Sequence, residues 1–292
     1  MTKSTATLVG LTAILMWSLL AVLTVATGRI PAFQLLAMTF AIGACIGPLT
    51  WIRRPGAWRA LRQPIVVWLV GVGGLFGSHA LYFLALRFAP PAEAGLLNYL
   101  WPLLIVVLSS LLPSERLARH HIVGATLGFA GTVILFAGNS GPGFNEVYLP
   151  GFAAAFVAAF VWAGYSILSR KFAEVPTDIV AGYCAATAAI AAIVHFTFET
   201  TIWPETLAQW LAIAALGIGP VGIAFFVWDI GMKRGDVRVL GAASYATPLL
   251  STGFLIVAGF AKPTLALAIA AALIVGGGLI ASKDMILRAQ RD

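Results

Sequence analysis

The sequence contains few charged residues. Asp, Glu, Lys and Arg make up 10% of its 292 residues, whereas a soluble domain contains about 25%. Residues of the set AVILMFWYC make up 60%, and the mean hydropathy is +0.95. A water-soluble globule needs polar atoms to cover its surface. This composition therefore argues against a soluble enzyme, a disordered chain and a nucleic-acid binder, and it predicts an integral membrane protein in contact with the lipid bilayer.

Cysteine and catalytic motifs are also scarce. Cys45 and Cys184 both lie in apolar runs, so we expect neither a disulfide framework nor a zinc site. The nucleotide-binding pattern G-x-x-x-x-G-K-[ST] and the catalytic patterns H-E-x-x-H and G-x-S-x-G do not occur. We therefore expect no catalytic residue, no metal ion and no cofactor, and we interpret the chain as a protein that is not an enzyme.

Long apolar runs dominate what the sequence does contain. A helix that crosses the hydrocarbon core needs about 20 mostly apolar residues, and ten such runs follow one another with turn or charge signals between them. The runs are continuous rather than alternating, which argues against the strands of a membrane barrel. The predicted helices are 6–27, 33–52, 65–86, 92–112, 121–138, 148–169, 178–198, 207–232, 238–259 and 264–285.

Lys and Arg are distributed unevenly among the connections. If the N-terminus lies in the cytoplasm, all of the 18 basic residues except Arg29, Arg87 and Lys262 fall on the cytoplasmic side. Basic residues resist translocation, so this bias predicts a multi-pass protein of a bacterial inner membrane with both termini in the cytoplasm. It also explains the net charge of +7 without a nucleic-acid partner.

The second half of the chain repeats features of the first. Residues 1–146 and 147–292 each contain five predicted helices, and because five is odd the second half enters the membrane from the opposite side. Inverted repeats of this kind are typical of secondary transporters. The pairs that align at a shift of 145 or 146 residues are Trp17 with Trp162, Pro31 with Pro176, Gly95 with Gly241, Tyr99 with Tyr245, Pro102 with Pro248 and Gly131 with Gly277.

These features resemble the drug/metabolite transporter superfamily. The resemblance is carried by the pattern ATLVGLTAILMWS at residues 6–18, by the two five-helix halves and by Tyr-x-x-Pro in the fourth and ninth helices. Within the superfamily, the chain is most similar to EamA-type ten-helix exporters, and among these to bacterial exporters of aromatic amino acids. The resemblance implies an all-α membrane protein whose helices surround a central cavity, and the export of small metabolites by alternating access.

Polar and aromatic side chains inside the predicted helices are candidates for the cavity lining, because polar groups are costly within a membrane. A pocket with His, Asn and aromatic walls suits an amino acid with a planar apolar side chain. The alternative is that the aromatic rings pack between helices and that His79 bonds a carbonyl. The candidates are Trp17, His79, Tyr82, Asn98, Tyr99, Trp101, Trp162, Tyr165, Ser244 and Tyr245.

Two prolines and one charged pair allow both a functional and a structural interpretation. Pro102 and Pro248 are candidate hinges, because each removes a hydrogen bond and kinks a helix, although many membrane prolines are merely tolerated. Asp229 and Lys233 are four residues apart, and we interpret them as an ion pair at a helix end.

Other residues are assigned to surfaces and connections. His120 and His121 are expected in a solvated loop, His195 at the membrane interface, and Trp203 and Trp210 in the interfacial belt.

Glycines are concentrated in the fifth and tenth predicted helices, and small residues let helices approach closely. We therefore expect these helices to join the two halves, with self-association as the rival use. The glycines are Gly124, Gly128, Gly131, Gly276, Gly277 and Gly278.

The sequence thus predicts a secondary transporter that exports amino acids, aromatic and other apolar ones, by alternating access. A broad-specificity metabolite or drug exporter is the first alternative, and a channel is the second. A channel would call for symmetry about the membrane normal rather than within the membrane plane. The sequence is consistent with a monomer but leaves the oligomeric state open.

His79 and Glu93 are the candidate proton-coupling residues, which gives a first testable prediction. If either residue carries a coupled proton, His79→Gln or Glu93→Gln abolishes the dependence of export on an imposed pH gradient, measured in proteoliposomes. Unchanged pH dependence in both variants would contradict the assignment.

Overall fold

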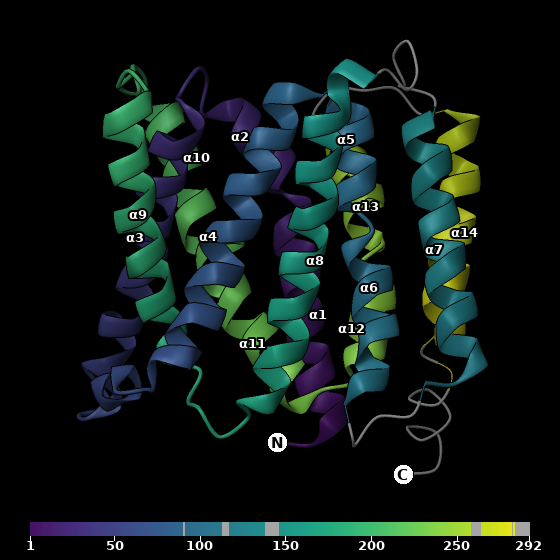
Figure 1. The fold of residues 1–292 in the computed structure, drawn as a ribbon, viewed down its shortest axis with the longest axis horizontal. Coiled ribbons are helices and arrows are strands. Elements are labelled where there is room, and N and C mark those ends of the chain that lie inside the picture. The colour runs from purple at the N-terminus through teal and green to yellow at the C-terminus, as the bar shows by residue number, and fades with distance from the viewer. Residues whose placement is uncertain (90, 113–116, 138–145, 258–263, 282, 284–292) are drawn as a thin grey trace.

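A computed structural model describes residues 1–89, 91–112, 117–137, 146–257, 264–281 and 283 (Figure 1). This part of the chain is helical and contains no strand. The helices of the first half are α1 (Lys3–Ser18), α2 (Leu20–Ala26), α3 (Ala32–Trp51), α4 (Ile65–Phe88), α5 (Pro91–Asn98), α6 (Trp101–Leu108) and α7 (Arg119–Ala137). Those of the second half are α8 (Leu149–Lys171), α9 (Ile179–Phe198), α10 (Leu207–Ile218), α11 (Ala224–Arg234), α12 (Val237–Ala243), α13 (Ala246–Val257) and α14 (Leu265–Ala281).

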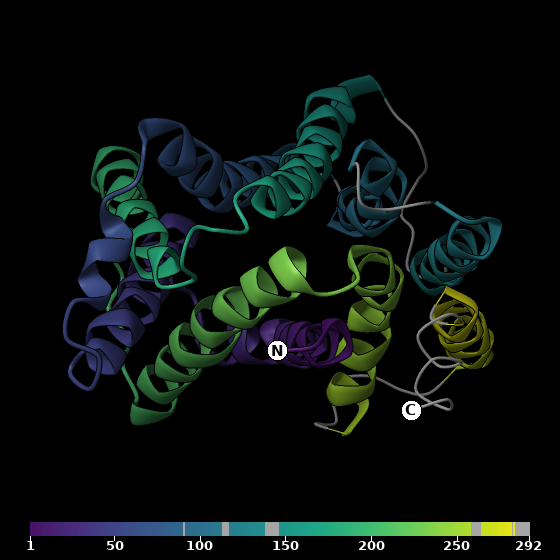
Figure 2. The same cartoon turned by 90° about the horizontal axis from the view of Figure 1, so that it is seen from below.

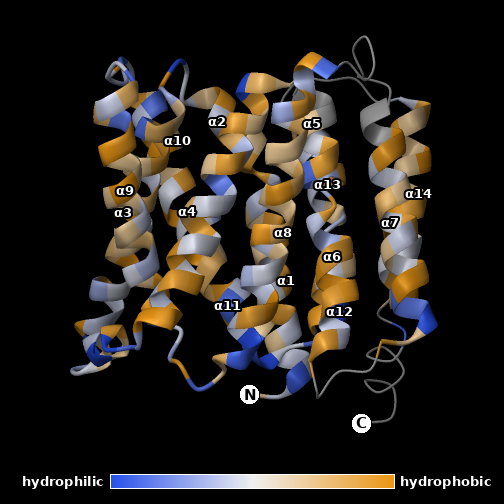
Figure 3. Ribbon diagram, viewed as in Figure 1, coloured by the Kyte–Doolittle hydropathy of each residue, from blue (hydrophilic) through white to orange (hydrophobic). Residues whose placement is uncertain are grey.

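The predicted segments coincide with single helices or with two consecutive helices. Within the described residues, seven stretches are long and apolar enough to cross a membrane, and α14 is a shorter apolar helix. Figure 3 shows hydrophobic residues along the middle of the bundle and hydrophilic ones gathered at its ends. The protein is therefore an all-helical, multi-pass membrane protein, while the count of ten spans stays a prediction.

Four of the predicted spans are interrupted. The first breaks at Leu19 between α1 and α2, and α10 is joined to α11 by the π-helical turn η4 (Gly219–Ile223). α5 and α6 are separated at Tyr99, and the break between α12 and α13 at Tyr245 lies at the equivalent point of the repeat.

The two candidate hinge prolines lie at these breaks rather than inside a continuous helix. Pro102 is in the first turn of α6 and Pro248 in the first turn of α13. The first N–H groups of a helix lack an acceptor within the helix, so the missing N–H of proline costs little there. Each proline therefore starts a new helix after a break, and a hinge role stays a prediction.

The long helices pack in pairs that link the two halves. α3 packs along α9 and α7 along α14, and each of these pairs consists of helices at equivalent positions of the predicted repeat. α4 packs along α8 and α1 along α11, and these two pairs correspond to each other. Figures 1 and 2 show α7 and α14 side by side at one edge of the bundle.

The two ends of the bundle differ in how these helices meet. At the end where the N-terminus lies, called the N-terminal end below, α8 packs against α11 and α6 against α12 (Figure 1). The equivalent pairs at the opposite end are α2 with the end of α4, and α5 with α13. Within the described helices neither of these pairs has comparable packing. Among the described helices, these particular pairs therefore meet at the N-terminal end and not at the opposite end.

Close packing between α7 and α14 confirms the expected role of their glycines. A Cβ atom built on Gly277 would lie 2.5 Å from the carbonyl oxygen of Gly124 and 3.0 Å from the amide nitrogen of Gly128. The expectation is wrong for Gly276 and Gly278, because a Cβ on either would meet nothing within 4 Å. They lie on a different face of α14 from Gly277, because successive residues of a helix point about 100° apart.

The structure corrects the expectation for His121 and adds the surroundings of His195. His121 belongs to α7 rather than to a solvated loop and is buried, and its Nδ1 accepts a hydrogen bond from the Ala118 amide at 3.1 Å. His195 lies in the last turn of α9 and is buried there, with its ring nitrogens 2.9 Å from Glu199 Oε2 and Thr201 Oγ1, so its position at the membrane interface stays a prediction. Nearby backbone and side-chain groups satisfy both rings, which makes their burial tolerable.

Two adjacent glycines of α14 provide a matched test of this interface. Gly277→Ala should lower the free energy of unfolding by about 1–3 kcal/mol, because the new methyl group overlaps the α7 backbone. Gly276→Ala should leave stability unchanged or slightly raised, since Ala favours a helix more than Gly does. Thermal unfolding of the purified protein in detergent measures both changes. Equal melting temperatures for the two variants would contradict the proposed packing.

Candidate functional site

Four tryptophans from four helices meet inside the bundle. They are Trp17 of α1, Trp101 of α6, Trp162 of α8 and Trp228 of α11, and none is more than 8% exposed. Their ring centroids lie between 5.0 Å apart, for Trp17 and Trp228, and 6.4 Å apart, for Trp162 and Trp228. Aromatic rings attract one another at these separations, especially edge to face. The structure thus brings three predicted candidates together around one that was not predicted.

Further rings extend this tryptophan cluster toward α3 and α4. The ring of Phe225 lies 6.1 Å from that of Trp17 and stacks on Phe40 at 5.5 Å. His79 meets the Phe40 ring edge-on at 5.4 Å. Its Nδ1 lies 2.7 Å from the carbonyl oxygen of Leu75. A carbonyl only accepts, so Nδ1 donates and Nε2 is left to accept. His79 therefore makes the carbonyl bond of the structural interpretation while also contacting the cluster.

The indole N–H groups of the tryptophan cluster divide into two kinds. Trp17 donates to the carbonyl oxygen of Pro220 at 3.0 Å, and Trp228 donates to Ser166 Oγ at 3.2 Å. Pro220 lies in the π-helical turn η4, where the regular α-helical hydrogen bonding is interrupted. Among the residues that the structure describes, the indole N–H groups of Trp101 and Trp162 donate no hydrogen bond. Two donors are therefore left for another molecule.

Four other candidate residues, on α4 and at the end of α5, are more exposed than the tryptophans. His79, Tyr82, Asn98 and Tyr99 are half-buried, whereas the four tryptophan rings of the cluster are buried. These residues belong to helix pairs that do not close the end opposite the N-terminus.

Tyr165, Ser244 and Tyr245 are all buried but differ in their surroundings. The ring centroid of Tyr165 lies 5.4 Å from that of Trp162, and its hydroxyl has no hydrogen-bond partner within the described part of the chain. Ser244 donates to the carbonyl of Leu240 at 2.7 Å, so its hydroxyl is used within its own helix. The Tyr245 hydroxyl accepts a hydrogen bond from the Leu103 amide at 3.1 Å, which satisfies a donor in the first turn of α6.

Tyr245 therefore supports the helix break at Tyr99 rather than joining the tryptophan cluster. Its ring packs against Gly128 and Phe129 of α7. The side chain of Glu93 lies outside the residues whose side chains the structure describes.

The sequence-based reasoning missed Phe40, Phe225 and Trp228. The repeat carries a signal for two of them, since a shift of 146 residues places Phe225 on His79 and Trp228 on Tyr82. Phe40 has no such signal, because a phenylalanine in an apolar helix is unremarkable until its neighbours are known.

A buried ion pair lies next to the tryptophan cluster on α11. Lys233 Nζ is 2.9 Å from Asp229 Oδ2, and the two side chains are only 3% and 1% exposed. The Thr177 hydroxyl donates to Asp229 at 2.7 Å, and Lys233 donates to the carbonyl oxygen of Val175 at 2.9 Å. The predicted pair is confirmed, and its burial makes these further bonds necessary.

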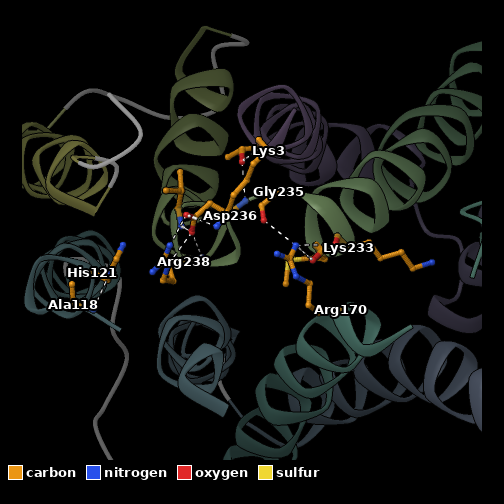
Figure 4. A network of polar contacts seen from close by, with 11 residues as sticks. Lys3, Ala118, His121, Arg170, Lys233, Gly235, Asp236 and Arg238 are labelled. Carbon is orange, nitrogen blue, oxygen red and sulfur yellow. Dashed lines mark hydrogen bonds and ion pairs between the residues drawn. The ribbon is translucent and has the colours of Figure 1, made fainter. Parts of the chain in front are cut away.

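A second group of charges lies at the N-terminal end (Figure 4). Asp236 Oδ2 is 2.7 Å from Arg238 Nη2 and 3.2 Å from Lys3 Nζ. Burial by itself would raise the pKa of the Asp236 carboxyl, but the hydrogen bonds from Arg238 and the positive charge of Lys3 outweigh it. Together they hold this pKa well below its usual range, so the carboxylate is charged at neutral pH.

Two pockets lie on the surface away from the tryptophan cluster. One, of about 280 Å³, is lined mainly by apolar side chains between α3 and α9 and includes Gln34, His195 and Trp203. The other, of about 240 Å³, includes Cys45 and Trp51. Neither contains a residue of the predicted site.

Comparison with known proteins agrees with this architecture. The model of the EamA-like transporter family matches the chain twice, over residues 4–137 and 149–283. The chain is 57% identical over 283 residues to the aromatic amino acid exporter YddG of Ancylobacter novellus, which covers 97% of this chain and 98% of the relative.

One further relative and one solved structure extend the comparison. The exporter of the same name from Escherichia coli is 27% identical, over 96% of this chain and 97% of its own. A solved crystal structure with 57% sequence identity superposes with a TM-score of 0.92, over 96% of this chain and 99% of that one.

The hydrogen bond of Tyr245 leads to a stability prediction. Tyr245→Phe keeps the ring but leaves the Leu103 N–H without its acceptor, which should lower the free energy of unfolding by about 1–3 kcal/mol. Denaturant or thermal unfolding measures the loss. Tyr148→Phe is the control, because Tyr148 precedes α8 and is only half-buried. A stability equal to the control's would show that the hydroxyl does not support the α6 break.

Proposed function

The chain belongs to the EamA-like transporter family, and on this premise we propose that it is a secondary transporter that exports amino acids across the bacterial inner membrane. Aromatic and other apolar amino acids are the proposed substrates, and alternating access is the proposed mechanism. The observation that carries this proposal is the tryptophan cluster, in which two indole N–H groups donate to no described residue. Relatives named aromatic amino acid exporters support the substrate class.

Two inverted five-helix repeats are the proposed basis of alternating access. The double match to one family model, the equivalent breaks at Tyr99 and Tyr245, and the corresponding helix pairs all support this division. We place residues 1–146 in the first repeat and 147–292 in the second, giving ten spans with both termini in the cytoplasm. Exchanging the conformations of similar halves would move the opening from one side of the membrane to the other.

The proposed site recognises the two ends of an amino acid by different groups. The substrate ring packs against the faces and edges of the tryptophan cluster and Phe225. The carboxylate accepts hydrogen bonds from the indole N–H groups of Trp101 and Trp162. The amine lies toward the half-buried Asn98 and Tyr99, which supply oxygen acceptors. No lysine or arginine contributes to this group of residues, which disfavours phosphorylated substrates.

Two alternatives remain for direct comparison. A broad-specificity metabolite or drug exporter would use the same aromatic surface without depending on the carboxylate. A channel would conduct its solute without saturation. The family membership favours a transporter over a channel.

The experiment compares Trp101→Phe and Trp162→Phe in proteoliposomes, with labelled tryptophan and with tryptophan amide, which lacks the carboxylate. Each variant keeps an aromatic ring but removes one N–H donor. We expect the KM for tryptophan to rise about tenfold or more, as for a lost hydrogen bond to a charged group. The KM for the amide should change little.

Trp203→Phe is the matched control, because Trp203 is 65% exposed at the surface. Equal losses for both substrates would favour the broad-specificity exporter. Transport that fails to saturate would favour the channel, and no transport of any aromatic amino acid would overturn the substrate proposal.

A further inference from the structure

The polar contacts between α8 and α11 are concentrated at the N-terminal end. Arg170, near the end of α8, donates from Nη1 to the carbonyl oxygens of Met232, Lys233 and Gly235 at 3.2, 2.8 and 3.0 Å (Figure 4). These carbonyls lie at the C-terminus of α11, where a helix has no N–H partners left and carries partial negative charge. A single cation on α8 therefore caps the end of α11.

The buried ion pair adds two contacts to the same junction. Residues 172–178 connect α8 to α9. Thr177 of this connection donates to Asp229, and Val175 accepts from Lys233. Because both charged side chains are buried, each would lose a partner if α11 moved away from this connection. Moving α11 away from the end of α8 and this connection therefore breaks both of these bonds as well as those of Arg170.

The opposite end of the bundle has no equivalent set among the described residues. Its corresponding helices, α2 and the end of α4, lack comparable packing, and most of the equivalent side chains are apolar. Under the repeat, Arg170 corresponds to Val25, Thr177 to Ala32, Asp229 to Phe83 and Lys233 to Arg87. Within the described residues, the ionic junction between α8 and α11 thus has no counterpart between α2 and α4. The charged contact described at the opposite end is a different one, from Glu199 after α9 to the first amides of α3.

We propose that Arg170, Asp229 and Lys233 form a latch that holds the N-terminal end closed and makes the conformation open at the opposite end the resting state. The latch must break once in each cycle before substrate can enter from the N-terminal side. The inference rests on the proposed transport cycle for its role, but the latch itself can be detected without substrate.

Hydrogen–deuterium exchange of the full-length protein in lipid nanodiscs tests the latch. Asp229→Asn, Arg170→Gln and Thr177→Val each weaken it, and Thr177→Val does so without changing a charge. We expect exchange at 172–178 and 235–239 to become roughly tenfold faster, as for the loss of one charge-assisted bond. Exchange in α2 and in the last turn of α4 should become slower, because that end closes when the N-terminal end opens.

Lys3→Gln is the matched control. It removes an ion pair of the same end, with Asp236 at 3.2 Å, but this pair joins α1 to the turn between α11 and α12, and α1 packs along both helices. The control should leave the balance between the two ends unchanged.

Faster exchange at both ends in the latch variants, or no change at either end, would overturn the latch. An opposite shift at the two ends without transport of any amino acid would keep the latch and overturn the proposed substrate.

Discussion

A membrane-spanning chain must satisfy its backbone hydrogen bonds internally, because lipid offers no partners. This protein interrupts its helices at several points, and at two of these interruptions a side chain bonds a backbone group. Tyr245 accepts from the Leu103 amide after the α5–α6 break, and Trp17 donates to Pro220 in the π-helical turn. Arg170 donates to the carbonyls that end α11. The positions of these three side chains are therefore constrained by the backbone groups that they must reach.

This constraint also separates the supporting residues from those free to bind. Trp17 and Trp228 use their N–H groups within the protein, whereas Trp101 and Trp162 do not within the described chain. All four rings contribute to one aromatic surface, but only two can offer a hydrogen bond to a substrate. One cluster thus combines a rigid apolar wall with two directional donors, which is the combination that a zwitterion with an apolar ring requires.

Charge is used differently at the two ends of the bundle. The N-terminal end holds the buried pair of Asp229 and Lys233 as well as the partly exposed group around Asp236. A buried ion pair contributes little net stability, but separating its partners is costly. Both partners lie on α11, so the pair itself stays intact if α11 moves. The bonds that would break are those from Thr177 to Asp229 and from Lys233 to the carbonyl oxygen of Val175, and their loss leaves buried charges with fewer partners.

Much of this could be predicted from the sequence. The composition and the length of the apolar runs predicted that the chain lies in a membrane and is helical, because a membrane-spanning helix must be long and apolar. The repeat indicated that Trp17 and Trp162 are related, and glycine spacing predicted that α7 meets α14. The surroundings of His121 and His195 could not be predicted, because their partners come from the chain around a helix end, and polar residues look exposed until those partners are known.

Tertiary structure alone decided which side chains are satisfied and which are available. The sequence does not distinguish Trp17 from Trp162, since both are tryptophans at equivalent positions, yet only Trp17 faces a carbonyl released by a π-helical turn. It also does not show that Tyr245 supports a backbone break while its repeat partner Tyr99 stays half-buried. Periodicity and length are properties of the chain, whereas hydrogen-bond satisfaction depends on which groups the fold brings within about 3 Å of one another.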